Sequence, residues 1–262
     1  MISARVSFIF GSMIQAFIRS FLLPWTSILL IFRNGKLFLY SLIPWVFNVV
    51  IFAGLLFLYG YSGKSLAERI SSSLGDAWWA EVLAWLTGIL LFLGLTALQV
   101  LLFTYIAMLL SGVFGEQLSF HTEHHLRGSA NPSPEGNMIK IFIRSVVEEL
   151  KGMLFFALGF LLLLLLNFII PVIGSAMFAV AAPLWTAYSL AFEFTAPTTE
   201  RRGLHFREKR RFIFKHPAAA LGFGLGILPM SLIPIVNFTF IPFAIVGGTR
   251  WFLMHEETEA SR

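Results

Sequence analysis

The sequence contains no cysteine and few charged residues for its length. Without cysteine the chain has no disulfide, no thiolate metal ligand and no cysteine nucleophile. Charged residues make up 13% of the 262 residues and hydrophobic residues 57%, whereas a soluble domain carries roughly a quarter charged residues. A water-soluble protein of this size could not bury so much apolar surface, so the composition predicts an integral membrane protein.

The sequence motifs of several enzyme classes are also missing. The chain has no serine elbow, phosphate-binding loop or dinucleotide fingerprint. Gly222-x-Gly224-x-Gly226 lies in an apolar run, without the preceding strand that such a fingerprint requires. These glycines are more typical of closely packed helices. We therefore predict a protein that is not an enzyme and that needs no cofactor.

Long stretches without charge dominate what is present. Four of them, 37–63, 82–115, 152–192 and 217–249, together cover about half of the chain. A spanning helix needs roughly 20 apolar residues, so each stretch is long enough to cross a bilayer. The sequence predicts an all-α integral membrane protein with a single membrane domain over residues 1–262.

The first 32 residues have the pattern of an amphipathic helix at the bilayer surface. Apolar residues recur there at helical spacing among serine, glutamine and arginine side chains, a pattern typical of interfacial helices. The alternative is a first spanning helix, which Arg19 and Pro24 would interrupt. Two long transmembrane helices are predicted to follow over 37–61 and 82–126, and a second amphipathic helix over 137–151.

Two helical hairpins are predicted in the C-terminal half, over 152–195 and 217–252. Each contains a proline near its middle, Pro171 or Pro234, and neither turn carries a charge. A turn that reached water would be expected to be polar, whereas irregular apolar backbone at membrane depth is tolerated where protein shields it. We therefore predict re-entrant hairpins that penetrate partway, with full spans as the alternative.

The distribution of basic residues predicts the orientation of the chain, because Lys and Arg accumulate on the cytoplasmic side. A hairpin returns the chain to its starting side. One side of the membrane then holds the residues before 37, the segments 112–151 and 197–217, and the C-terminus. These parts contain 17 of the 19 Lys and Arg residues, and the segment 64–81 on the other side contains two. Both termini are predicted to be cytoplasmic.

Two groups of polar residues suggest chemistry but have plainer interpretations. His121, Glu123 and His125 suggest a metal site, yet the spacing is not the zinc signature and Glu123 lies on another helix face; we interpret the segment as a solvated helix end without metal. The segment 197–217 is interpreted as a cytoplasmic loop that touches anionic lipid, through Arg201, Arg202, Arg207, Lys209, Arg210, Arg211 and Lys215.

A smaller basic group stands directly before the first long helix. Arg33, Asn34, Gly35 and Lys36 lie where free backbone N–H groups and the helix dipole favour anions. This spacing could hold a small oxyanion. The alternative is a positive anchor whose side chains reach the membrane surface.

Four blocks of the sequence form a recognisable set by their order and spacing. They are Leu42-Ile43-Pro44-x-x-x-Asn48, Gly115-Glu116-Gln117-Leu118, Ile170-Pro171-x-x-Gly174 with Trp185, and Phe223-Gly224 followed by Ile233-Pro234-x-x-Asn237 and Gly247-Gly248-Thr249. In these blocks the chain resembles the CysZ-type sulfate permeases of bacterial inner membranes, within the etoposide-induced-protein superfamily, and the resemblance covers roughly residues 20 to 252.

The resemblance implies an amphipathic first helix, two long spanning helices, two partly penetrating hairpins and a homo-oligomer whose neighbouring chains can be antiparallel, whereas the charge count predicts one orientation. The family pattern also places a glycine and two arginines before the first span as the sulfate site. Gly35 matches that glycine, but the arginine positions fall on Phe38 and Leu39. Pore or structural candidates are Asn48, Glu116, Gln117, Pro171, Gly174, Pro234 and Asn237.

The expected function is an inner-membrane permease for sulfate or a related oxyanion, supplying sulfate for assimilation. The expected partners are the anion, membrane lipids and further copies of the chain, and not nucleic acid. The alternative is a non-transporting scaffold that binds lipids or partner proteins through its basic loops.

Overall fold

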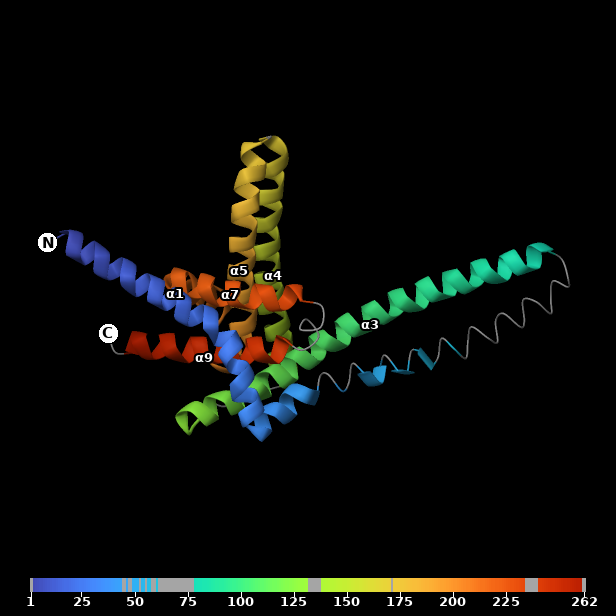
Figure 1. Cartoon of the computed structure of the whole chain (residues 1–262). Coiled ribbons are helices and arrows are strands. Elements are labelled where there is room, and N and C mark those ends of the chain that lie inside the picture. Colours follow the sequence, from blue (N-terminus) through green and yellow to red (C-terminus); the bar gives the residue numbers. More distant parts are fainter. Residues whose placement is uncertain are drawn as a thin grey trace. The chain divides into compact units, whose positions relative to one another are not determined.

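The computed structural model describes residues 2–43, 46, 49–51, 53–54, 56–57, 60, 78–131, 138–170, 172–233 and 240–260 (Figure 1). Regular structure in these ranges is helical throughout, which confirms the predicted all-α membrane fold. The helices with assigned bounds are α1 (Ile2–Arg33), α3 (Trp78–Arg127), α4 (Met138–Ile169), α5 (Ile173–Arg201), α6 (Phe206–Lys215), α7 (Pro217–Leu232) and α9 (Phe240–Ala260).

The chain forms two compact units, one of residues 1–41 with 115–262 and one of residues 42–114. The smaller unit contains most of the helix predicted over 37–61 and the first part of α3. Its described residues are helical and expose large apolar side chains such as Phe57 and Trp85. The sites discussed below all lie in the larger unit.

Three helical segments in the described part of the chain are long and apolar enough to cross a membrane: Gly11–Arg33, Ile143–Ile169 and Ile173–Arg201. A fourth candidate is the pair α6 and α7, which is bent by 98° and would count as one broken or re-entrant span. Length and composition alone define these candidates. The surface or spanning position of α1 and the depth of each hairpin remain predictions.

The first hairpin is formed by α4 and α5, which lie side by side (Figure 1). Val172 in its turn has a φ of 68°, a left-handed conformation that is uncommon for a β-branched residue. A Cβ on Gly174 would stand 2.6 Å from the carbonyl oxygen of Leu166, so the glycine permits the close approach of the two helices. The tip is apolar and exposed, with Val172 at 82%.

The helix α4 differs from the prediction of a separate amphipathic helix over 137–151. It runs without interruption from Met138 to Ile169, so the amphipathic segment is the beginning of the first hairpin helix. Gly152 does not break it. A Cβ there would lie 2.5 Å from the ring of Phe192, which shows that this glycine accommodates a ring from α5.

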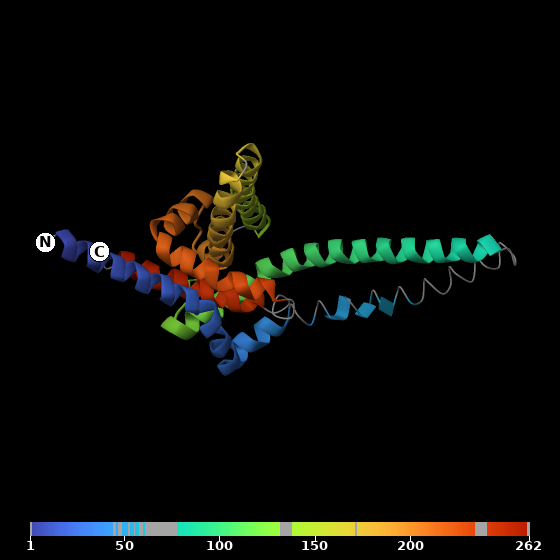
Figure 2. The same cartoon turned by 45° about the horizontal axis from the view of Figure 1, so that its top comes forward.

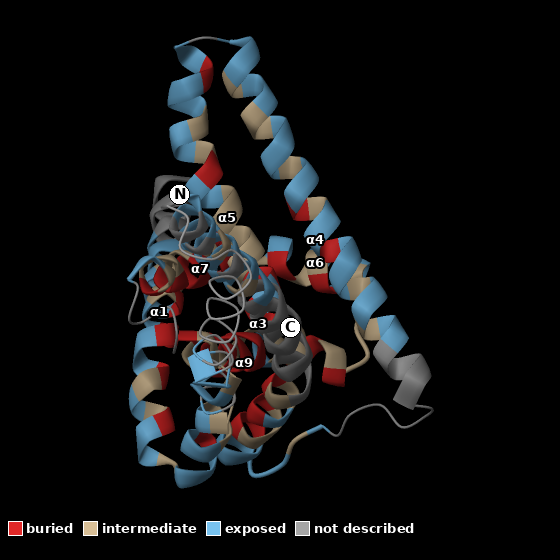
Figure 3. Ribbon diagram, turned by 90° about the vertical axis from the view of Figure 1, so that its right-hand side faces the viewer, coloured by how far each residue is buried: buried red, intermediate tan, exposed pale blue. Residues whose placement is uncertain are grey.

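The core of the larger unit lies where α1, α5, α7 and α9 pack together (Figures 2 and 3). Cβ atoms on Gly222 and Gly226 would stand 2.3 Å from carbonyl oxygens of α1, and one on Gly224 would stand 1.8 Å from the carbonyl oxygen of Ala187. The prediction that these glycines serve helix packing is confirmed. Trp251 of α9 is fully buried in the same core.

Pro24 lies inside α1, as the helix predicted over residues 1–32 requires, whereas the loop predicted over 197–217 is wrong. Pro24 does not end α1, which continues to Arg33; the α-carbon of Pro24 instead faces Gly247 of α9, where a Cβ would lie 3.2 Å away. The segment 197–217 is not a loop. It contains the end of α5 and the whole of α6, because this polar stretch has a helical pattern that buries Lys209 and Ile213.

Candidate anion-binding site

The residues before the first long helix form a helix cap. Residues 35–43 are helical, and the Asn34 side-chain oxygen accepts hydrogen bonds from the backbone N–H groups of Lys36 at 3.1 Å and Leu37 at 3.4 Å. An asparagine is well suited to this N-cap position. The cap therefore engages two of the N–H groups that the sequence argument had assigned to an anion.

A pocket of about 560 Å³ opens beside this cap. Its walls come from two segments far apart in the sequence, the cap and the C-terminal end of α3, and the lining residues are Asn34, Gly35, Lys36, His121, His124 and His125. No carboxylate is among these lining residues. Lys36 brings a full positive charge and no lining residue brings a negative one, so the pocket suits an anion rather than a cation.

Hydrogen bonds to the pocket walls indicate which imidazole nitrogens carry protons. The Asn34 amide nitrogen lies 3.1 Å from His125 Nδ1, and because an amide NH₂ only donates, His125 Nδ1 accepts and its Nε2 carries the proton. His121 Nδ1 lies 2.8 Å from the Gln117 carbonyl oxygen, so it donates there. With Nδ1 donating to Gln117, the neutral His121 ring presents Nε2 as an acceptor.

The structure brings together three of the four residues predicted for the anion site. Arg33 is exposed and does not line the pocket, whereas Asn34, Gly35 and Lys36 do. A Cβ on Gly35 would meet no atom within 4 Å, so the glycine leaves this side of the pocket open. Four other candidates lie outside the described residues: Asn48, Pro171, Pro234 and Asn237.

The remaining candidates occupy different places. Glu116 is half-buried in α3, and Gln117 is exposed and holds His121 through its carbonyl group. Gly174 lies at the tip of the first hairpin. None of the three lines the pocket at the cap.

Glu123 belongs to a buried cluster of charges instead of a solvated helix end. It is 2% exposed, and its two carboxylate oxygens bind Arg201 at 2.7 Å and Arg202 at 2.6 Å. Arg202 also binds Glu256 at 2.7 Å, and Arg127 binds Glu256 at 2.8 Å. The interpretation of Arg201 and Arg202 as lipid-binding loop residues is therefore wrong, because their charges are paired inside the protein.

Glu256 shows the electrostatic effect of this cluster. Burial disfavours its carboxylate, but hydrogen bonds and charge from Arg202 and Arg127 outweigh that effect and hold its pKa below the ordinary value. The cluster includes a second carboxylate bound to Arg127 at 2.8 Å, that of Glu257. The positive charges of Arg127, Arg201 and Arg202 thus equal the negative charges of Glu123, Glu256 and Glu257. The cluster therefore has no excess positive charge for an external anion.

Lys209 of α6 is buried as well. Burial lowers its pKa to about 8, against the opposing effect of the surrounding carboxylates, Glu200 and Glu149 foremost. Its ammonium group lies 4.0 Å from the ring centroid of Phe192, a cation–π contact. Lys209 is thus an internal residue and does not face lipid headgroups.

The sequence matches the family described as "Sulfate transporter CysZ/Etoposide-induced protein 2.4" over residues 23–242. The chain belongs to this family.

Curated relatives in three bacteria bear the name "Sulfate transporter CysZ". The protein of Vibrio cholerae serotype O1 (strain M66-2) is 28% identical over 230 residues, 85% of this chain and 88% of the relative. The protein of Pseudomonas fluorescens (strain Pf0-1) is 28% identical over 227 residues, which cover 84% of this chain and 88% of the relative. The protein of Pseudomonas aeruginosa (strain LESB58) is 26% identical over 236 residues, which cover 88% of this chain and 93% of the relative.

Sequence blocks that carry the family resemblance meet in the core. A Cβ on Gly115 would lie 3.3 Å from both Pro197 and Ile245, and one on Gly248 would lie 2.1 Å from the Phe194 carbonyl oxygen. These glycines let α3, α5 and α9 approach closely. Two of the four family blocks, those with Gly115 and Gly248, therefore lie at one helix junction, although they are far apart in the sequence.

Buried hydroxyl groups link the same three helices. The Ser119 hydroxyl lies 2.8 Å from that of Thr198, which donates to the Thr249 hydroxyl at 3.0 Å. Arg201 donates to the Ser119 hydroxyl at 3.0 Å. Each of these three buried hydroxyl groups thereby has a partner, as buried polar groups in proteins generally do.

The part of the site that sequence reasoning missed is the role of the histidines. His121, His124 and His125 are spaced so that they share one helix face, and this spacing was available as a signal. It suggested a metal, but in the described ranges no group of three or more His, Asp or Glu side chains is arranged to hold a metal ion. The joining of this face to the Asn34 cap could not be read from local sequence.

Proposed function

We propose that this protein is a permease that lets sulfate or a related oxyanion cross the bacterial inner membrane. The observation that carries the proposal is the pocket at the Asn34 cap, whose lining offers Lys36 and three imidazoles and no carboxylate. Membership of the CysZ family supports the same substrate class. Supply of sulfate for assimilation is the role that follows for such a permease.

The chemistry of the pocket suits a tetrahedral oxyanion. A divalent anion that leaves bulk water must receive fixed charge and hydrogen-bond donors in exchange for lost hydration. Lys36 supplies a full positive charge, and the Nε2 proton of His125 supplies a directed donor. These groups replace the arginine pair of the family pattern, whose positions hold Phe38 and Leu39 in this chain.

Passage is passive or driven by an existing gradient, because the sequence has no ATP-binding motif. The pocket is the cytoplasmic binding site in this proposal, in line with the charge count, which places both termini inside.

The pathway is proposed to lie between copies of the chain. Large apolar side chains are exposed on the hairpin tip and on α4, including Phe168 at 73% and Ile169 at 72%. In a homo-oligomer such surfaces face lipid or a neighbouring copy. Among the described residues the buried charges of Glu123 and Arg201 are paired with each other, so a pore is easier to form at an interface than through this core.

The scaffold alternative loses part of its support, because three of the seven basic residues on which it relied are engaged within the protein. It required basic residues of the 197–217 segment to be available to partners, whereas Arg201, Arg202 and Lys209 are engaged internally. No other structural observation favours it over transport.

Labelled sulfate uptake into liposomes tests the proposal. The purified protein should give saturable, protein-dependent uptake, and Lys36→Ala should reduce it. Arg211→Gln is a matched control, because Arg211 is an exposed cation on α6 and lies outside the pocket. Well-folded protein without any sulfate uptake would contradict the permease assignment.

A further inference from the structure

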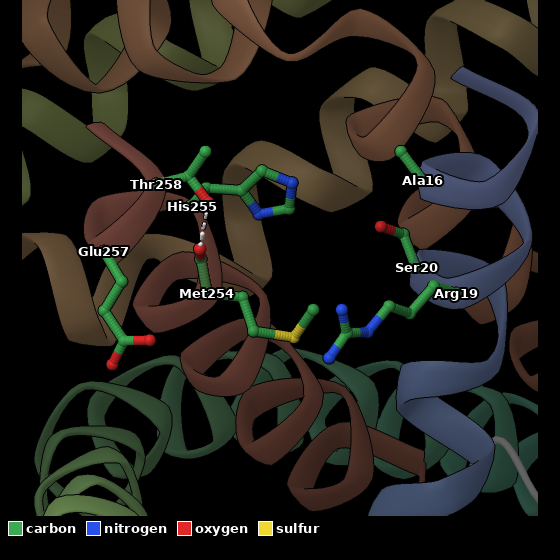
Figure 4. Close-up of a pocket in the computed structure, with 7 residues that line it drawn as sticks. All are labelled: Ala16, Arg19, Ser20, Met254, His255, Glu257 and Thr258. Atoms are coloured by element: carbon green, nitrogen blue, oxygen red, sulfur yellow. Dashed lines mark hydrogen bonds between the residues drawn. The ribbon is translucent and has the colours of Figure 1, made fainter. Parts of the chain in front are cut away.

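A second polar pocket, of about 400 Å³, lies between α1 and α9 (Figure 4). It shares no residue with the pocket at the Asn34 cap. The lining residues come from one turn of each helix, Ala16, Arg19 and Ser20 from α1 and Met254, His255, Glu257 and Thr258 from α9.

The pocket has an excess of positive and hydrogen-bonding groups. Arg19 and His255 extend into the space between the two helices, whereas Glu257 points away (Figure 4) and binds Arg127 at 2.8 Å. In the described part of the chain no carboxylate forms an ion pair with Arg19. The guanidinium group is therefore available to an external anion.

A further cation lies one helical turn before this pocket on α9. Arg250 donates hydrogen bonds to the hydroxyl groups of Thr26 at 2.8 Å and Ser27 at 3.1 Å. Both partners are neutral, so its charge adds to the positive potential between α1 and α9. Two arginines and a histidine thus face one helix junction without a paired carboxylate among the described residues.

The side of α1 that turns away from Ala16 and Ser20 carries an exposed apolar stripe. Its members recur every three or four residues and so share one helix face; they are Ile14 at 53%, Ile18 at 52%, Leu22 at 47%, Trp25 at 37% and Leu29 at 60% exposure. Arg19 stands at the edge of this stripe, three residues before Leu22. An anion held by Arg19 would therefore lie between the pocket and this long apolar surface.

We propose that the pocket between α1 and α9 binds the phosphate group of an anionic phospholipid, whose acyl chains lie along the apolar stripe of α1. The phosphodiester accepts hydrogen bonds from the Arg19 guanidinium, whose fork matches phosphate geometry. The buried Ser20 hydroxyl also faces this space (Figure 4). Free phosphate would engage the same donors but would leave the apolar stripe uncovered, so the stripe favours a lipid.

This assignment moves the lipid contact from the 197–217 segment to α1. The sequence suggested the former because seven basic residues gather there, but burial and ion pairs engage Arg201, Arg202 and Lys209. Arg19 has no basic neighbour in the sequence, yet in the fold it lines a pocket and lies next to the apolar stripe of α1. A bound lipid in this position also fixes α1 against α9.

Native mass spectrometry of the detergent-solubilised full chain with dioleoylphosphatidylglycerol measures this binding. Replacing Arg19 with glutamine removes a charged hydrogen bond, so Arg19→Gln should weaken lipid binding by about tenfold to a hundredfold, and Arg19→Lys should restore part of it. The control Arg211→Gln should bind as the wild type does. Equal lipid affinity in the wild type and a folded Arg19→Gln variant would overturn the proposal.

Two further probes identify the source of the phosphate group. Dioleoylglycerol, which has the acyl chains without phosphate, should not compete with the phospholipid, and inorganic phosphate should compete only weakly. Inorganic phosphate that binds as tightly as the phospholipid would show a free-phosphate site and refute the lipid assignment. Sulfate binding at the Asn34 cap should be the same in Arg19→Gln as in the wild type, which separates the two sites.

Photolabelling of the wild-type protein gives a test that does not depend on a variant folding. A phosphatidylglycerol with a diazirine on its headgroup should label peptides containing residues 16–20 and 254–258. Labelling confined to other peptides would overturn the proposal.

Discussion

Lys36 and Arg33 are neighbours in sequence, but their places in the structure separate their functions. Lys36 lines the pocket at the Asn34 cap, whereas Arg33 is exposed outside it. The sequence argument treated the two as equal sources of charge, because both flank Gly35. Only the fold shows that the histidine face of α3, and not Arg33, joins Lys36 in lining the pocket.

Single substitutions should reveal this difference. A charged hydrogen bond contributes about 1.5–3 kcal/mol, so Lys36→Ala should weaken sulfate binding by roughly ten- to a hundredfold at 1.4 kcal/mol per decade. Arg33→Ala should have a much smaller effect, because its side chain does not reach the pocket. Isothermal titration of the solubilised protein measures both affinities, and an Arg33→Ala loss as large as that of Lys36→Ala would contradict this geometry.

Lys209 gives a prediction for pH. Its pKa is about 8 in the folded protein, whereas the unfolded chain keeps the ordinary lysine value near 10.5. Between these values the unfolded state binds more protons, so the free energy of unfolding rises with pH across this window, by up to about 3 kcal/mol for a single lysine. This contribution is complete above pH 10.5 and is lost as the pH falls through 8.

Melting curves in detergent from pH 7 to 10.5 test this, with Lys209→Met as the reference because it cannot titrate at this position. The wild type should become more stable relative to the variant as the pH rises from 8 to 10.5. A constant difference over this range would show that Lys209 is not desolvated in the folded protein.

The elements themselves were largely predictable, because hydrophobic periodicity and glycine spacing are local properties. The first hairpin, the long second helix and the packing role of Gly222, Gly224 and Gly226 all follow from such patterns. The polar segments were harder. Arg202 binds Glu256, which is 54 residues away in the chain, and no local pattern distinguishes a paired arginine from a solvated one.

The helix junction at Gly224 should not tolerate a side chain. A Cβ there would lie 1.8 Å from the backbone oxygen of Ala187, so Gly224→Ala requires the helices to separate and should cost about 1–3 kcal/mol. Gly11→Ala is the matched control, since a Cβ on Gly11 meets nothing within 4 Å. Thermal unfolding should show a lower Tm for Gly224→Ala alone; an unchanged Tm would mean that α7 and α5 do not pack as described.

The tip of the first hairpin should be shielded from water in the membrane. A cysteine at Val172 should resist membrane-impermeant thiol reagents from either side, whereas a cysteine at Ser72 should react from outside. The apolar, exposed tip motivates this expectation, because lipid or a neighbouring chain must cover it. Ready labelling at Val172 from outside would show that this hairpin spans the bilayer fully.

At the scale of the whole molecule, the pocket at the Asn34 cap depends on residues that are distant in sequence. Asn34 and His125 are 91 residues apart, and each segment alone suggested something else: a basic anchor and a metal site. Charge counting and composition predicted the membrane setting without structural information. The combination of a cap, a lysine and a histidine face is a tertiary property, which explains why sequence reasoning reached only part of it.

Sulfate flux is the most direct test of the central claim, that this pocket admits an oxyanion to a transport path. Liposomes containing wild-type protein should take up labelled sulfate in a saturable manner. The double variant Lys36→Ala, His125→Ala should raise the half-saturating sulfate concentration at least tenfold, while Arg33→Ala and Arg211→Gln remain near the wild type. Uptake by a folded double variant with wild-type concentration dependence would show that the anion enters elsewhere and would contradict the account.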